Sequence, residues 1–185
     1  MIKTALVLVD IQNDYFPGGR HPLHNPEPAA EKAGDALRLF RENGWPIFHV
    51  RHVNTNVNAT FFLPDTDGIR FYQPLMPRTN EPVVVKHRPD SFYNTDLEEH
   101  LAAHGVRRLV ICGMMTHMCV DTTVRSAKGR DYDVILPHDA CATRDLAWDN
   151  AVIPARTVQG AYMSALQGAF AEVVPTRILE TALNR

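Results

Sequence analysis

Short apolar runs of strand length alternate along the chain with longer segments in which apolar residues recur at helical spacing. The first run, ALVLVD at 5–10, has almost no polar alternation, which is typical of a strand that is covered on both faces. Similar runs lie within 45–53, 82–87, 107–113, 131–140 and 171–176. The pattern predicts a strand in each of them.

The intervening segments have the spacing of amphipathic helices. In the segment 27–44, Ala33, Leu37 and Phe40 lie along one face, and Gly44 is a suitable C-terminal residue. Helices are also expected within 95–105, 117–130 and 154–170. Strands that alternate with helices of this length indicate βαβ units, in which the strands are parallel and helices cover both faces of the sheet. We therefore expect an α/β fold with a mainly parallel sheet.

Three segments lack a clear period. A loop rich in Pro, Gly and Asn follows the first strand, and 141–150 is predicted to be a loop or a short helix. The segment 54–81 is long for a structureless connection, so we expect a functional loop there. The chain shows no internal repeat and no linker, and its 185 residues suit a single domain that spans 1–185.

Composition and charge narrow the classes of partner. The formal net charge of −2 argues against binding to nucleic acid, because neutralising phosphates needs a surplus of Lys and Arg. The N-terminal apolar run is too short for a secretory leader or a membrane span. The three cysteines form no CxxC pair, which indicates free thiols in a reducing compartment. We expect a cytoplasmic protein that binds neither nucleic acid nor membranes.

Three residues with reactive side chains follow predicted strands. Parallel α/β sheets bind ligands at the carboxyl ends of their strands, so polar residues there are candidates for a site. Asp10 ends the first strand and Lys86 the third, while Cys119 lies in the first turn of the helix after the fourth strand, with Thr116 as its expected N-cap. A helix N-terminus favours thiolate over thiol. A carboxylate beside the thiol could take its proton, and a nearby ammonium group would lower the pKa of the thiol.

Each of these residues also has an ordinary structural explanation. Cys119 could be a small apolar filler of the core, and Asp10 could cap the turn that follows its strand. Lys86 could extend its stem along apolar surface with its charge in water. Together, however, the three supply a nucleophile, a base and a cation at one edge of one sheet.

Four stretches of the chain resemble the isochorismatase-like cysteine hydrolases, a superfamily that includes nicotinamidases. They are LVLVDIQNDYF, VVVKHRPDSFYNTDLEEHL, LVICGMMTHMCVDTTVRSA and ILPHDACATRD, and the resemblance extends from residue 4 to about 175. It implies a three-layer α/β/α fold, Rossmann-like, with a six-stranded sheet. It also implies a catalytic triad of Asp10, Lys86 and Cys119, and a cis peptide bond between Met114 and Met115. The oxyanion hole of the family maps onto the backbone N–H groups of Met115 and Cys119.

The chain departs from nicotinamidases where those enzymes bind a metal. They carry an Asp-x-His motif after the second strand and a further His downstream. Here His52 stands in the Asp place and Asn54 in the place of the first His, and no His occurs between 55 and 80. His49 alternates with Arg51 in a strand pattern, which favours a packed histidine over a ligand. We therefore expect no metal, no cofactor and no nicotinamidase activity.

Candidates for the substrate pocket come from the loops around the predicted triad. They are Phe16, Phe61, Phe62 and His117. The aromatic residues could equally belong to the core. If they line the site, the substrate is a small molecule that is at least partly apolar. His117 would then orient a polar group of the substrate, or else only contribute to the start of the helix.

The leading hypothesis is a metal-independent cysteine hydrolase that cleaves a C–N bond in a small amide, ureide or lactam. One alternative is the vinyl ether hydrolysis of isochorismatase itself, although the cysteine favours a carbonyl substrate. Another is a binding or scaffold protein that has kept the fold, although the complete triad argues against it. Members of the family are commonly homo-oligomers, so we expect a dimer or a larger assembly.

Overall fold

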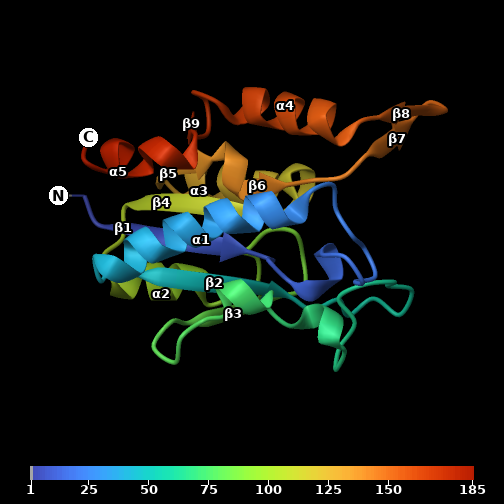
Figure 1. Ribbon diagram of the computed structural model, residues 1–185. Helices are drawn as coiled ribbons and strands as arrows, with labels where there is room; N and C mark the ends of the chain where they lie inside the picture. Colours follow the sequence, from blue (N-terminus) through green and yellow to red (C-terminus); the bar gives the residue numbers. More distant parts are fainter. Residues whose placement is uncertain (1) are drawn as a thin grey trace.

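A parallel β-sheet forms the centre of the protein. The computed structural model describes residues 2–185, and Met1 lies outside this range. The main strands are β1 (Thr4–Val9), β2 (Ile47–His52), β3 (Val83–Lys86), β4 (Arg108–Met114), β5 (Asp133–Pro137) and β9 (Glu172–Val174). They lie in the order β3-β2-β1-β4-β5-β9, and every neighbouring pair is parallel (Figure 1). The expected α/β fold is confirmed.

The sheet has seven strands, one more than the resemblance implied. The additional strand, β6 (Cys141–Ala142), pairs in parallel with Gly113 and Met114 at the end of β4. It is followed by an antiparallel hairpin of β7 (Leu146–Trp148) and β8 (Ala151–Ile153), which projects from the body of the molecule in Figure 1. The prediction of a loop or short helix for 141–150 was therefore wrong, because strands this short leave no periodic pattern.

Helices cover both faces of the sheet. They are α1 (Pro26–Glu42), α2 (Leu97–Ala103), α3 (Asp121–Lys128), α4 (Ala155–Leu166) and α5 (Leu179–Leu183). In Figure 1, α1 crosses in front of the central strands, whereas α2 and α3 lie behind them, which gives the three expected layers. Among residues 2–185, no helix is long and apolar enough to cross a membrane.

The order of the strands places the ends of β1, β2 and β3 beside one another. β1 lies between β2 and β4 and is almost completely buried, because its apolar side chains are covered on both faces. β3 is an edge strand with alternating exposure, in which Val83 and Val85 are exposed while Val84 and Lys86 are buried. The alternation directs the side chain of Lys86 into the molecule rather than into solvent.

Gly113 allows β4 to approach β1 closely. It pairs with Val9 and has a φ of +132°, which L-amino acids rarely adopt, and a Cβ atom there would collide with the carbonyl oxygen of Val9.

We expect Gly113→Ala to lower the free energy of unfolding by about 3 kcal/mol or more. Urea denaturation would measure the change. Gly160→Ala in α4 is the control, because that position has open space and Ala favours a helix. Equal stability of the two variants would contradict this account.

Candidate active site

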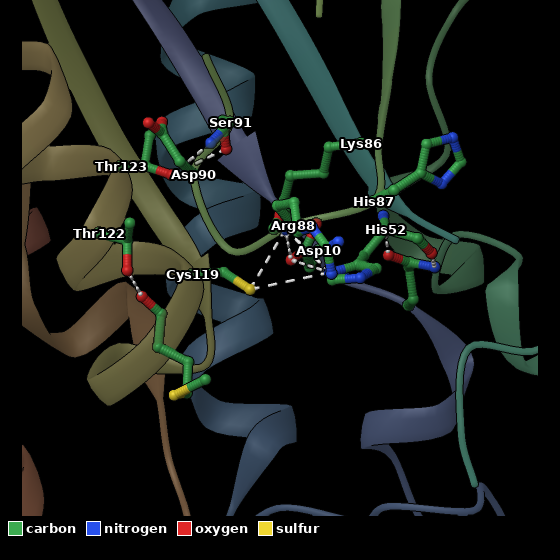
Figure 2. A network of polar contacts seen from close by, with 12 residues as sticks. Asp10, His52, Lys86, His87, Arg88, Asp90, Ser91, Cys119, Thr122 and Thr123 are labelled. Carbon is green, nitrogen blue, oxygen red and sulfur yellow. Dashed lines mark hydrogen bonds and ion pairs between the residues drawn. The ribbon is translucent and has the colours of Figure 1, made fainter. Parts of the chain in front are cut away.

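The side chains of Asp10, Lys86 and Cys119 meet at the carboxyl edge of the sheet (Figure 2). Nζ of Lys86 lies 2.7 Å from Oδ2 of Asp10 and 3.2 Å from Sγ of Cys119. Asp10 and Lys86 are fully buried, and Cys119 is 4% exposed. Three residues that are far apart in the sequence therefore form one cluster that is nearly closed to water.

Asp10 and Lys86 owe their positions to the ends of their strands. Asp10 follows β1 with a φ of 53°, a left-handed conformation that Asp tolerates better than most residues, so the extended strand stops there. Its N–H group still donates to the carbonyl oxygen of Val50 in β2, at 3.1 Å. Lys86 is the last residue of β3. Lys86 therefore stands on a regular strand and Asp10 directly after one, and such positions are held more firmly than positions within loops.

The segment before α3 positions Cys119 differently from what the sequence indicated. Residues Thr116–Val120 form a turn of π-helix that leads into α3, and Met115 is its N-cap. The expected N-cap role of Thr116 was wrong, because its hydroxyl lies 2.7 Å from Oε1 of Gln159 and 3.2 Å from the carbonyl oxygen of Ala142. Cys119 thus lies inside a π-helical turn, a feature that is frequent at functional sites.

Met115 and Cys119 belong to the same short segment. The peptide bond between Met114 and Met115 is cis. The carbonyl oxygen of Met115 accepts hydrogen bonds from the N–H groups of Met118 and Val120, at 3.0 and 3.2 Å. These bonds close the turn around the cysteine and hold the backbone of both residues in the buried part of the site.

Burial and charge keep Cys119 protonated in the resting site. Burial raises the pKa of Cys119, and the Asp10 carboxylate raises it further, whereas Lys86 lowers it. The thiolate favoured by the helix N-terminus is therefore not the resting form, because a second buried anion beside Asp10 is unfavourable. Burial alone would lower the pKa of Lys86, but Asp10 and then Cys119 raise it above its ordinary value, so Lys86 stays an ammonium group. Carboxylate, ammonium and thiol together carry no net charge.

His52 is a fourth member of the cluster, and its part in it was missed by the sequence analysis. Its Nδ1 lies 3.0 Å from Nζ of Lys86, 4.0 Å from Sγ of Cys119 and 3.9 Å from Oδ2 of Asp10. The available signal was its place near the end of the second predicted strand, at the same edge as Asp10 and Lys86. In the sequence, His52 stood out only as the residue in the Asp place of the nicotinamidase metal motif.

The donor atoms around Cys119 are close enough to be considered for a metal. One ligand atom each from Asp10, His52 and Cys119 lies within 4.8 Å of the others. Nζ of Lys86, however, lies 2.7 Å from the carboxylate, 3.0 Å from the imidazole and 3.2 Å from the sulfur. A metal ion would have to displace this ammonium group, so the cluster fits a metal poorly while Lys86 is charged.

His49 does not join this cluster. Its Nε2 lies 2.8 Å from Oε2 of Glu81, and Glu81 also accepts two hydrogen bonds from Arg41, at 2.7 and 2.8 Å. His49 and Glu81 are both buried. His49 is therefore a packed histidine within an ion-pair network, as its strand pattern indicated.

This network should make the stability of the fold sensitive to acid. Burial alone would raise the pKa of Glu81, but hydrogen bonds from Arg41, the backbone of Arg78 and His49 lower it from 4.5 to about 2. Because the folded pKa is the lower one, the stabilisation is present above about pH 4.5 and is lost as the pH falls towards 2. We expect a loss of up to roughly 3 kcal/mol from Glu81. Urea denaturation across this window should show a weaker pH dependence for Glu81→Gln, and identical curves would contradict the assignment.

The long loop 54–81 is anchored beside the site by Asp14, another residue that the sequence analysis did not single out. Asp14 is buried, and its Oδ2 accepts a hydrogen bond from the N–H group of Phe62 at 2.6 Å. Its Oδ1 accepts one from the N–H group of Arg20 at 3.1 Å. Gly68 approaches the same carboxylate so closely that a Cβ atom there would collide with it. One buried carboxylate therefore ties two loops together.

The four candidate pocket residues have different surroundings. Phe62 is fully buried, with its ring centre 5.7 Å from that of His52, so it lies beside the cluster. Phe61 is partly buried and packs against Phe62, with ring centres 4.9 Å apart. Phe16 is buried and its ring stacks on that of Tyr72, with ring centres 3.7 Å apart. This contact is typical of core packing.

His117, the fourth candidate, lies on the turn that carries Cys119. Its Nδ1 is 2.6 Å from Oγ1 of Thr143, which follows β6. Its ring also contacts that of Tyr162 in α4, edge to face, with centres 6.1 Å apart. The residue is half-buried.

The chain is similar to known proteins over nearly its whole length. Residues 4–168 match the family model of the isochorismatase domain. The chain is 48% identical over 175 residues to YddQ of Bacillus subtilis, an uncharacterised isochorismatase family protein, and the match covers 95% of this chain and 97% of YddQ. The crystal structure of an isochorismatase from Pseudomonas putida superposes with a TM-score of 0.89 at 36% identity, over 95% of this chain and 89% of that one.

A more distant relative carries the name of an amide-cleaving enzyme. It is the ureidoacrylate amidohydrolase RutB of Azorhizobium caulinodans, which is 28% identical to this chain over 171 residues. The match covers 75% of each chain. A protein named as an amidohydrolase therefore occurs among the relatives of this chain.

Proposed function

This chain belongs to the isochorismatase family of hydrolases, and we propose that it cleaves a C–N bond of a small amide-type molecule through a thioester on Cys119. The contact of Lys86 with both Asp10 and Cys119, at 2.7 and 3.2 Å, is the observation that carries the proposal. It places a nucleophile and a proton acceptor on either side of one fixed cation, and a carboxylate oxygen of Asp10 lies within 4.8 Å of the sulfur, an arrangement that suits nucleophilic catalysis.

In the first step, Asp10 takes the proton of the Cys119 thiol as the sulfur attacks the carbonyl carbon of the substrate. Lys86 stabilises the sulfur anion while the proton moves. The carbonyl oxygen becomes an oxyanion, and the N–H groups of Met115 and Cys119 donate hydrogen bonds to it. Donors of this kind are effective because they are already in place before charge develops.

In the second step, the tetrahedral intermediate collapses and the C–N bond breaks. Protonated Asp10 gives its proton to the leaving nitrogen, which departs as ammonia or an amine. Water then attacks the thioester with Asp10 as the base, the acid is released, and the thiol regains its proton. Each proton that Asp10 accepts is thus returned within the cycle.

Two observations favour an amide over a vinyl ether. The cluster holds a buried thiol next to a carboxylate, which suits attack on a carbonyl carbon. A relative over three quarters of the chain is named as an amidohydrolase. The substrate is a small molecule, and Phe61, Phe62 and His117 are proposed to contact it.

A substrate panel tests the proposal. Purified protein would be incubated with small primary amides, ureides, carbamates and lactams, and release of ammonia or amine would be followed. The same protein would be incubated with isochorismate, and pyruvate would be followed. Intact mass spectrometry of quenched reactions should detect an acyl group on Cys119. Pyruvate release without any C–N cleavage would favour the vinyl ether reaction and contradict the proposal.

The oligomeric state and the compartment stay predictions. We propose a homo-oligomer of one-domain subunits that acts in the cytoplasm. Size-exclusion chromatography with light scattering would measure the mass of the assembly, and a monomer at micromolar concentration would contradict the first part.

A further inference from the structure

The ammonium group of Lys86 has more acceptors than hydrogens. Its Nζ lies 2.7 Å from Oδ2 of Asp10, 3.0 Å from Nδ1 of His52, 3.0 Å from the carbonyl oxygen of Arg88 and 3.2 Å from Sγ of Cys119 (Figure 2). An ammonium group has three N–H donors. In the structure the three hydrogens bond to His52, Arg88 and Cys119, and the carboxylate of Asp10 lies against the ammonium group as an ion pair.

The balance among these acceptors changes when the thiol proton moves. Once Asp10 holds that proton it is neutral, and the sulfur has become an anion. The strongest acceptor beside Lys86 is then the thiolate rather than the carboxyl group, because hydrogen bonds to ionised groups are the stronger ones. The imidazole of His52 and the carbonyl of Arg88 do not change charge in this step.

The backbone holds His52 firmly in front of Lys86. The two residues are direct partners in the parallel register of β2 and β3. The buried side chain of Gln12 binds the backbone of His52 twice: its Oε1 accepts from the N–H group at 2.7 Å, and its Nε2 donates to the carbonyl oxygen at 2.9 Å. His52 thus has its main chain tied to the segment that follows β1, which also carries Asp10.

The charges around His52 keep its ring a hydrogen-bond acceptor. The pKa of His52 is lowered to about 4, first by burial and then by the charge of Lys86. His87 and Arg88 act in the same direction, while Asp10 opposes them. At neutral pH the imidazole is therefore uncharged, and Nδ1 can accept a hydrogen bond from the ammonium group.

We propose that His52 is a positioning residue which, together with the carbonyl of Arg88, anchors two hydrogens of the Lys86 ammonium group so that the third stays directed at the sulfur of Cys119 when the thiol proton moves to Asp10. The inference rests on the proposed function. The only covalent change is the transfer of one proton from Sγ to the carboxylate, and the cluster stays neutral before and after it. Without the anchor, the ammonium group would follow Asp10 or turn away from the sulfur.

A matched pair of variants tests this anchor. Leu and Asn have nearly the same shape, but only Asn offers an acceptor atom in the place of Nδ1. Both would be introduced at His52 together with Asp10→Asn, so that the thiol titrates against Lys86 without a competing carboxylate. His49→Asn in the same background is the control for disturbing β2, because His49 contacts Glu81 instead.

The readout is the rate of alkylation of Cys119 by iodoacetamide between about pH 6 and 10, with the modified residue identified by mass spectrometry. All three thiols are buried, but only Cys119 has an ammonium group beside it that lowers its pKa. Burial raises the pKa of Cys112 well above its ordinary value and that of Cys141 to about 12, so these two should react slowly. We expect His52→Leu to raise the apparent pKa of Cys119 by about one unit, which slows alkylation roughly tenfold at neutral pH. The alkylation rates of the variants with His52→Asn or His49→Asn should stay within about threefold of the rate of Asp10→Asn alone, because both keep an acceptor for the ammonium group.

The outcomes separate the two proposals. If Cys119 of the Asp10→Asn protein reacts no faster than the other thiols at any pH, the pairing of Lys86 with the sulfur is absent, and the proposed function fails with it. If that protein reacts fast but His52→Leu does not slow it, His52 is not the anchor and only this inference falls. If His52→Asn is as slow as His52→Leu while both unfold at the temperature of the parent, the imidazole acts by its shape and the inference is also overturned.

Discussion

Replacing Cys119 by Ala is expected to abolish hydrolysis and to leave the fold intact. The sulfur is the only atom of the cluster that can form the thioester, so its loss removes the covalent route altogether. Removal of a catalytic nucleophile lowers turnover by at least about 10⁴-fold in enzymes of comparable mechanism. The side chain is small and makes few specific contacts, so the free energy of unfolding should change by about 1 kcal/mol.

The measurement compares turnover of the best substrate from the panel with urea denaturation of the same samples. Cys141→Ala is the matched control: its thiol is also buried and free, but its sulfur contacts the carbonyl oxygen of Pro137, at 3.5 Å, and not the cluster. The control should keep most of its activity. Normal turnover by Cys119→Ala would contradict the proposed mechanism. An unfolded Cys119→Ala protein would show that the thiol is needed for packing instead.

Asp10→Asn is expected to stop turnover and, at the same time, to make the Cys119 thiol more acidic. The two effects have different causes. Turnover falls by about 10³-fold or more because no group is left to accept the thiol proton and to return it to the leaving nitrogen. The pKa of Cys119 falls because the carboxylate that raised it is gone, while Lys86 still lowers it.

Lys86→Met is the matched control for this prediction, because it should shift the thiol in the other direction. Without the ammonium group, burial and Asp10 act alone, so the pKa of Cys119 should rise further. Thiolate absorbance in the ultraviolet, followed against pH, would measure both shifts, and turnover should be low in both variants. A higher thiol pKa in Asp10→Asn than in the parent would show that the carboxylate does not oppose the thiolate.

Prediction from the sequence succeeded best for elements that one local property, such as an apolar run, is enough to specify. The buried strands were predictable because an apolar run of that length is typical of a strand in the centre of a parallel sheet. The positions of Asp10 and Lys86 at one edge followed from the rule that parallel strands end on the same side. β6 and the β7–β8 hairpin were not predictable, because two or three residues carry no period and their pairing depends on β4 and on each other.

The candidate site divides in the same way. Its three charged or nucleophilic members could be named from the sequence. The position of His52, however, depends on the register of β2 against β3 and on the hydrogen bond from its backbone N–H group to Gln12. The side chain of Thr116 suits an N-cap by its local sequence, yet its hydroxyl donates a hydrogen bond to Gln159, which lies far away in the sequence. Contacts between segments that are remote in sequence leave no local pattern.

The sequence by itself determined the class of the fold, the order of its six main strands and four longer helices, and the residue types available at the carboxyl edge of the sheet. Only the tertiary structure decided that a neutral imidazole joins the cluster and that the thiol rests in its protonated form. The physical reason is that propensity and periodicity act over a few neighbouring residues, whereas the charge state of a group is set by burial and by every charge around it in space.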